Sequence, residues 1–154
     1  MQTGVRPVTS MPQITPLEDY TISPICMAYL DKMRLLCEDY GVELVLIKAP
    51  SIYPIWYEEW DAQIAAYADT HGLAYYNLYD LSEEIGIDWE LDTYDAGLHL
   101  NVWGAEKLSR YFGRLLRETH GVASKRGNLE LELIWTRKEA AYVTQKAQAK
   151  SPYQ

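Results

Sequence analysis

Residues 42–47 read VELVLI and residues 73–79 read LAYYNLY, and these two stretches decide the fold class. Both are short, nearly continuous apolar runs rich in β-branched or aromatic residues, which predicts strands, the first of them buried on both faces. Between them lies a stretch whose apolar residues recur at helical spacing, namely Trp60, Ile64, Tyr67 and Ala68. Strand, helix and strand in this order predict an α/β fold with a parallel sheet covered by helices.

Further helices are expected on both sides of this core. Apolar residues recur every three or four positions in residues 24–40 and in residues 105–116. A last helix is expected over residues 128–150, and we predict that its inward side chains are Leu131, Ile134, Trp135, Ala141 and Tyr142. Residues 80–100 form a long, acidic, aromatic loop, with one helical turn near residues 81–85.

The pattern divides the chain into an irregular leader (residues 1–21), an α/β domain (residues 22–120), and a C-terminal helix with a frayed tail (residues 121–154). Only two strands are convincing, and two parallel strands are too few for a stable open sheet. We therefore expect either that the leader supplies another strand or that the chain is the later part of a larger α/β domain.

Composition excludes several classes of function. The chain has 154 residues and a formal net charge of −8, which argues against nucleic acid as a partner because phosphates are neutralised by Lys and Arg. No apolar run approaches the roughly 20 residues of a bilayer span, so we expect a soluble chain without one. On one straight helix Cys26 and Cys37 would lie about 16 Å apart, which excludes a disulfide and predicts buried free thiols.

The three histidines differ in their neighbours. His71 and His120 each precede a glycine at the expected end of a helix, a position typical of a structural role. His99 instead stands in the long loop, just before a helix for which Asn101 is the expected N-cap.

Acidic residues lie close to His99 in the sequence. Asp95 is four residues upstream and Asp92 seven residues upstream. A carboxylate beside an imidazole holds its tautomer and stabilises the imidazolium, as a general base requires. The competing interpretation is a loop histidine that binds a carboxylate for structural reasons.

Other candidate site residues follow from the rule that sites in open α/β sheets lie beyond the carboxyl ends of the strands. Lys48 and Ser51 follow the first strand, where Ser51 is a candidate nucleophile or a substrate-pocket or oxyanion contact. Lys48 is a candidate for binding a carboxylate or developing oxyanion, although a lysine at a strand end is usually solvated. Trp56 and Trp103 are candidates for a pocket wall or for stacking on a sugar, with core packing as the alternative. Asn101 is a further candidate substrate-pocket or oxyanion contact.

Residues 95–116, DAGLHLNVWGAEKLSRYFGRLL, resemble the last conserved block of the SGNH/GDSL hydrolases, in which an Asp and a His precede an Asn, a Gly and an amphipathic helix. The stretches ELVLIKAPSIYPIW (residues 43–56) and GLAYYNLYD (residues 72–80) also resemble bacterial cell-envelope proteins of this type. The similarity covers residues 17–116. It implies a three-layer α/β/α, flavodoxin-like SGNH fold with a parallel sheet, incomplete at its N-terminal side.

The resemblance also implies a function. His99 would be the catalytic base and Asp95 its orienting acid, in an esterase or O-acyltransferase that acts on an acylated carbohydrate or another small ester. No cofactor or metal would be required, and the location would be extracytoplasmic or in the cell envelope.

The chain departs from the family pattern at two places. Ala96 stands where the family usually has its Asp, three residues before the His, and Asp95 is one residue further back. The family's Gly-Asp-Ser nucleophile block is absent from these residues. We therefore expect the chain to be the C-terminal part of an SGNH-like protein, with the base but without the nucleophile.

Two alternatives of other classes remain open. The first is a non-catalytic fragment or binding module of the SGNH fold that keeps a pocket without acyl chemistry. The second is an acidic partner-binding domain that self-associates through an exposed edge of the sheet.

Overall fold

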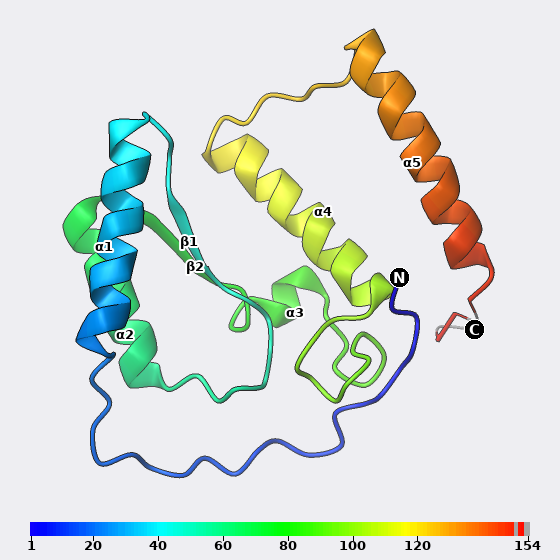
Figure 1. Ribbon diagram of the computed structural model, residues 1–154. Helices are drawn as coiled ribbons and strands as arrows, with labels where there is room; N and C mark the ends of the chain where they lie inside the picture. The colour runs from blue at the N-terminus through cyan, green and yellow to red at the C-terminus, as the bar shows by residue number, and fades with distance from the viewer. Residues whose placement is uncertain (150, 153–154) are drawn as a thin grey trace. The chain divides into compact units, whose positions relative to one another are not determined.

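The computed structural model of the chain describes residues 1–149 and 151–152 (Figure 1). These residues form five helices and one small sheet of two parallel strands, so the described part of the chain is a mixed α/β structure. The chain divides into two compact units. We call Met11–Leu81 the strand unit, and Met1–Ser10 together with Ser82–Gln154 the histidine unit.

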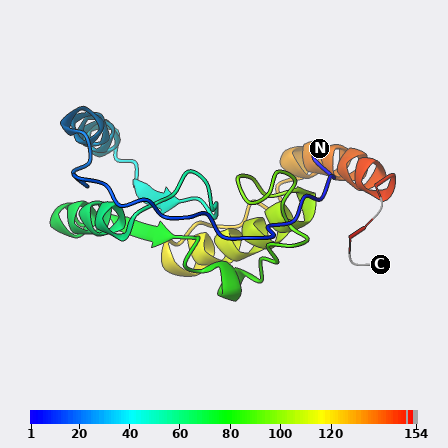
Figure 2. The same ribbon diagram turned by 90° about the horizontal axis from the view of Figure 1, so that it is seen from below.

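The strand unit is built on β1 (Val45–Lys48) and β2 (Ala74–Asn77), which pair in parallel along their whole length. Figure 2 shows the two arrows pointing the same way. The crossover between them contains α2 (Glu58–His71), which packs on β2. This helix ends at Gly72, whose φ of 64° is the left-handed conformation that glycine adopts without a steric cost. The strand–helix–strand order and the parallel pairing expected from the sequence are confirmed.

The first ten residues are hydrogen-bonded to the long loop of the histidine unit. Arg6 N–H donates to the carbonyl oxygen of Thr93 at 2.9 Å, and Ala96 N–H donates to that of Arg6 at 3.2 Å. The sheet of the strand unit holds only β1 and β2 among the described residues. The expectation that the leader supplies this sheet with a further strand is therefore wrong. The backbone hydrogen bonds of the leader are made to residues outside the sheet.

One side of α1 (Pro24–Asp39) is an open apolar face. Its large side chains recur at helical spacing and keep 51–69% of their surface exposed, namely Ile25, Tyr29, Met33 and Leu36. Cys26 is exposed and Cys37 is half-buried, both as free thiols. The predicted burial of Cys26 is therefore wrong, because no residue of α1 is fully covered by another element.

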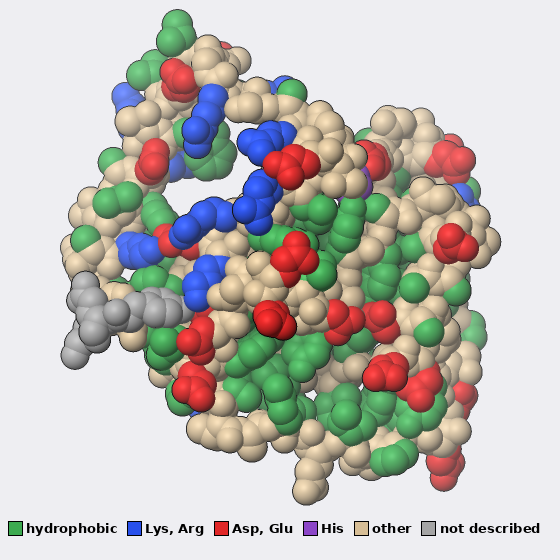
Figure 3. Space-filling model, turned by 180° about the vertical axis from the view of Figure 1, so that it is seen from behind, with side chains coloured by type: hydrophobic (Ala, Val, Ile, Leu, Met, Phe, Trp, Pro, Cys, Tyr) green, Lys and Arg blue, Asp and Glu red, His purple; other side chains and the backbone are tan. Residues whose placement is uncertain are grey.

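The sheet also keeps apolar surface open. Ile47 in β1 is 50% exposed, so the predicted burial of this strand on both faces is wrong. The reason is that β1 has one strand neighbour in the described part of the chain and that α2 packs on β2. Figure 3 shows hydrophobic side chains over much of the visible face, between scattered acidic ones.

The histidine unit contains α3 (Ser82–Ile85) and α4 (Val102–Thr119), which contact each other. Its buried apolar side chains come from both helices and from the turn after α3, and they are Ile85, Ile87, Val102, Trp103 and Tyr111. The expected helical turn near residues 81–85 is confirmed, and so is Asn101 as the N-cap of α4.

The last helix, α5 (Leu129–Ala147), begins after the N-cap Asn128 and has no buried residue. Trp135 is 62% exposed and Ile134 is 46% exposed, so their predicted inward orientation is wrong. The helix is instead held to α4 by polar contacts, because Glu106 accepts hydrogen bonds from Tyr142 and Lys146. Part of the expected frayed tail, residues 150 and 153–154, lies outside the described residues.

None of the helices in residues 1–149 and 151–152 combines the length and the hydropathy that a membrane-spanning helix needs.

Gly104 in the first turn of α4 lies against the backbone of the long loop, and this contact yields a stability prediction. A Cβ at Gly104 would lie 2.6 Å from the carbonyl oxygen of Asp92, whereas a Cβ at Gly113 in the same helix would meet nothing within 4 Å. We expect Gly104→Ala to destabilise the protein by about 1–3 kcal/mol through overpacking. We expect Gly113→Ala to stabilise it by about 0.5–1 kcal/mol through helix propensity. Urea unfolding of both variants measures these changes, and equal effects would contradict the close contact at Gly104.

Candidate functional site

Asp95 and His99 meet in the loop before α4. Asp95 Oδ2 lies 2.6 Å from His99 Nδ1, and Asp95 Oδ1 accepts a hydrogen bond from the backbone N–H of His99 at 2.7 Å. The turn between them is made by Ala96, with a φ of 62°, and Gly97, with a φ of 99°. Two residues with positive φ let the chain fold back, so a spacing of four residues still brings the carboxylate onto the ring.

The surroundings of His99 leave one ring nitrogen accessible. The side chain of His99 is 59% exposed and that of Asp95 is 25% exposed. The ring of Tyr94 stacks on the imidazole, with centroids 5.7 Å apart and planes 9° apart. Nδ1 is bound to Asp95, whereas Nε2 has no hydrogen-bond partner among residues 1–149 and 151–152. With Asp95 ionised, the neutral imidazole can donate its Nδ1 proton to the carboxylate, which leaves the lone pair of Nε2 for a proton donor.

The electrostatics of the pair favour an ionised carboxylate. Burial acts to raise the pKa of Asp95, but the hydrogen bonds from the ring and the backbone of His99 outweigh it. They hold the pKa of Asp95 below its ordinary value of 3.8. At neutral pH Asp95 is therefore an anion that can orient His99 and stabilise its protonated form.

Asp92, the other acid near His99 in the sequence, lies in a different environment. Its side chain is fully buried and pairs with Lys107 Nζ at 2.7 Å. It also accepts a hydrogen bond from the backbone N–H of Asp88 at 2.8 Å. The carboxylate that contacts His99 is therefore that of Asp95.

Asn101 and Trp103 are buried at the start of α4. Asn101 Oδ1 accepts hydrogen bonds from the backbone N–H groups of Trp103 and Gly104. Asn101 Nδ2 donates to three backbone carbonyls, the shortest of these bonds being 2.7 Å to Leu91. Trp103 is 7% exposed. The geometry gives both side chains a structural part, and their contact with a substrate stays a prediction.

Lys48 and Ser51 meet in the strand unit, after the end of β1. Lys48 Nζ donates to the hydroxyl of Ser51 at 3.2 Å and to the carbonyl oxygens of Ala49 at 2.7 Å and Ser51 at 3.1 Å. Burial lowers the pKa of Lys48, and the nearby carboxylates of Asp80 and Asp61 oppose this effect. The ammonium group therefore donates all three of these hydrogen bonds to the turn that follows β1.

A polar network that sequence reasoning missed lies in the same unit. Asp61 Oδ1 accepts hydrogen bonds from Trp56 Nε1 at 2.9 Å, Tyr75 OH at 2.5 Å and Asn77 Nδ2 at 2.9 Å. Burial and the bond to Asp61 raise the pKa of Tyr75. Asn77 Nδ2 also donates to Asp80 Oδ2 at 2.8 Å. Because sites in open α/β sheets lie beyond the carboxyl ends of the strands, the end of β2 could have indicated Asn77 and Asp80. No feature of the sequence distinguishes Asp61 from the other acids of α2.

This network borders a cavity of about 700 Å³, whose lining includes Ser51, Trp56, Asp61, Asn77 and Asp80. The volume is in the range of small-molecule sites in proteins. No group of three or more His, Cys, Asp or Glu side chains that could hold a metal ion occurs in the part of the chain that the structure describes.

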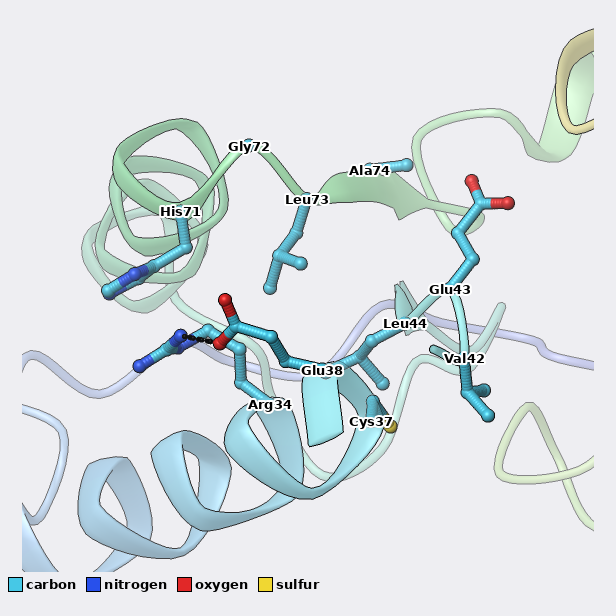
Figure 4. A pocket seen from close by; sticks show the side chains of 10 residues that line it. All are labelled: Arg34, Cys37, Glu38, Val42, Glu43, Leu44, His71, Gly72, Leu73 and Ala74. Carbon is cyan, nitrogen blue, oxygen red and sulfur yellow. Dashed lines mark hydrogen bonds and ion pairs between the residues drawn. The ribbon is translucent and has the colours of Figure 1, made fainter. Parts of the chain in front are cut away.

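A smaller cavity of about 280 Å³ lies between the end of α1 and the start of the strands (Figure 4). Arg34, the cation in its wall, is already paired with Asp31 at 2.8 Å and with Glu38 at 3.1 Å. His71 packs against Tyr67, with ring centroids 4.4 Å apart. The guanidinium of Arg34 is therefore already neutralised within the protein, and we assign this cavity no chemistry.

The structure brings the predicted site residues together as two pairs. Asp95 and His99 form one pair in the histidine unit, and Lys48 and Ser51 form the other in the strand unit. The first is a carboxylate–imidazole pair suited to general base catalysis, and its catalytic role stays a prediction. No family model, no curated protein and no solved structure matches the chain.

The Asp95–His99 bond yields a prediction on acid stability. Because the folded state lowers the pKa of Asp95 below 3.8, its contribution to stability is present above about pH 4. That contribution is lost as the pH falls through the folded pKa. We expect Asp95→Asn to cost about 1 kcal/mol at pH 7 and almost nothing at about pH 2. Urea unfolding at the two pH values measures the difference.

Asp69→Asn is the matched control, because Asp69 is an exposed acid near the end of α2. Its effect on the free energy of unfolding should be small at both pH values. A pH-independent cost of Asp95→Asn would show that the carboxylate of Asp95 is not stabilised by His99.

Proposed function

We propose that Asp95 and His99 are the acid–base pair of an SGNH-type esterase or O-acyltransferase. The observation that carries the proposal is the 2.6 Å contact between Asp95 Oδ2 and His99 Nδ1, in a loop that leaves the imidazole 59% exposed. A buried or unpaired histidine would not serve as a base in this way. The resemblance of residues 95–116 to the Asp/His block of the SGNH hydrolases supplies the reaction class.

The proposed mechanism uses the two nitrogens of His99 differently. Nε2 takes the proton from a serine hydroxyl as its oxygen attacks the acyl carbonyl of an ester. The resulting imidazolium is stabilised by Asp95 through Nδ1. Nε2 then returns a proton to the leaving alcohol, and the acyl group stays on the serine. In the second half of the cycle, His99 activates water for hydrolysis or an acceptor alcohol for transfer.

The nucleophilic serine of this mechanism is proposed from the resemblance alone. In the SGNH family the nucleophile stands in a Gly-Asp-Ser block, which residues 1–154 lack. Ser51 is the candidate within this chain, and its hydroxyl is bonded to Lys48 Nζ at 3.2 Å. The substrate class, an acylated carbohydrate or another small ester, and the cell-envelope location come from the resemblance as well.

The proposed fold is the three-layer α/β/α, flavodoxin-like SGNH fold, of which this chain forms the later part. Three observations support a larger α/β domain. The two parallel strands have no other strand neighbour in the described residues, and β1 keeps Ile47 half-exposed. The apolar face of α1, with Ile25 and Tyr29 more than 60% exposed, also lacks a cover there.

The test compares three histidine variants of the full chain in the hydrolysis of p-nitrophenyl acetate. His99 can activate water directly for attack on this reactive ester, so a rate is expected without the Gly-Asp-Ser serine. We expect His99→Ala to lower that rate by about a hundredfold or more, because a positioned base contributes about 10²–10⁴. His71→Ala and His120→Ala are matched controls at helix ends and should retain the rate. Circular dichroism checks that all variants fold.

A second measurement does not depend on the nucleophile. Nitrogen-15 NMR of the histidine rings should show that neutral His99 is protonated on Nδ1, and Asp95→Asn should abolish this preference. An equal mixture of tautomers in the wild type would contradict the proposed base.

Equal hydrolysis rates for wild type and His99→Ala, with the Nδ1 tautomer present, would favour the non-catalytic binding module. Self-association through the free edge of β1 is a separate proposal. Sedimentation over a range of protein concentrations tests it, and a monomer at every concentration would rule it out.

A further inference from the structure

The cavity of about 700 Å³ in the strand unit is lined by acidic side chains but by no basic ones. It is formed within Met11–Leu81 and is therefore independent of the Asp95–His99 pair. Its lining holds four carboxylates, those of Glu58, Glu59, Asp61 and Asp80. No Lys, Arg or His side chain is among its lining residues.

None of the four carboxylates forms an ion pair with a Lys, Arg or His in residues 1–149 and 151–152, although Asp80 and Asp61 are close enough to Lys48 to affect its pKa. Asp61 is hydrogen-bonded by three neutral donors, and Asp80 by the amide of Asn77. Lys48, which interacts electrostatically with Asp80 and Asp61, donates its three hydrogen bonds to Ala49 and Ser51 instead. Glu58, Glu59 and Asp80 are exposed and Asp61 is half-buried. Carboxylates outnumber cations even with Lys48 included, so the potential at this cavity is negative.

The rest of the wall is aromatic and aliphatic. Tyr20, Trp56, Tyr57 and Tyr79 contribute aromatic side chains, and Ile52 and Ile55 contribute aliphatic ones. Aromatic faces attract cations through the negative charge above the ring. The ring of Tyr79 already has a cation near it, because Lys48 Nζ lies 5.6 Å from its centroid.

We propose that this cavity binds an organic cation, a substituted ammonium group attached to a small apolar body. The carboxylates match its charge, the aromatic side chains match its polarisable methyl or methylene groups, and the isoleucines match its body. An anionic ligand is disfavoured by the four carboxylates. A bare metal ion has no set of three or more convergent ligands in the described residues.

The test uses choline and its neutral analogue 3,3-dimethylbutan-1-ol, in which carbon replaces the nitrogen. Binding is followed through the indole N–H signal of Trp56, which donates to Asp61 at 2.9 Å and is assigned with Trp56→Phe. We expect choline to shift this signal and to bind about tenfold more tightly than the neutral analogue. We also expect higher salt to weaken choline binding alone.

Two substitutions remove charge from the wall without touching Asp61, which holds the local structure. Asp80→Asn and Glu58→Gln should each weaken choline binding about three- to tenfold. Asp69→Asn is the matched control, since Asp69 is an exposed acid of α2 that does not line the cavity. It should leave the affinity unchanged.

Three results would overturn the proposal: no shift of the Trp56 signal at about 0.1 M choline, equal binding of the neutral analogue, or equal weakening by Asp69→Asn. His99→Ala should not change choline binding. Failure of the esterase proposal and failure of this one are therefore distinguishable.

Discussion

The side chain of Asn101 is the interaction on which the histidine unit depends. It is 1% exposed, and its oxygen caps the first turn of α4. Its amide nitrogen donates to carbonyl oxygens from separate segments, those of Gly4, Leu91 and Thr93. An unpaired buried polar group is costly, so these bonds hold the first residues of the chain and the long loop at the start of the helix. The backbone of His99, two residues upstream, is positioned by the same anchor.

The backbone strain at Ala96 accompanies the turn that brings Asp95 and His99 together. Ala96 has a φ of 62°, and a non-glycine residue in this region costs about 1–2 kcal/mol. The turn brings both oxygens of Asp95 onto His99, one on the ring and one on the backbone N–H. The exposed imidazole is thus held by a carboxylate whose own pKa is lowered by the contact. This arrangement is the physical basis of the proposed acid–base role.

The strand unit depends on a different acid. Asp61 Oδ1 connects α2 to β2 through Tyr75 and Asn77, and it fixes the indole of Trp56 beside the large cavity. Hydrogen bonds to Asp61 therefore contribute to the packing of this unit. Apolar packing contributes less at α1, which leaves an apolar face exposed. The cavity and the open apolar face of α1 lie in the same unit and differ in charge, since only the cavity combines carboxylates with its aliphatic and aromatic side chains.

The sequence by itself determined the local elements of this protein. Gly72 ends α2 and Asn101 starts α4, because a left-handed glycine and an N-cap amide act on backbone groups within a few residues. Spacing in the sequence placed two acids, Asp92 and Asp95, near His99, and the resemblance to the SGNH block selected Asp95. Only the tertiary structure decided which groups are buried. Asp92 is paired with Lys107 in the interior, whereas Ile47 and Cys26 are left open. The reason is that burial depends on segments distant in the sequence, and neither helical spacing nor an apolar run specifies which of them provides the cover.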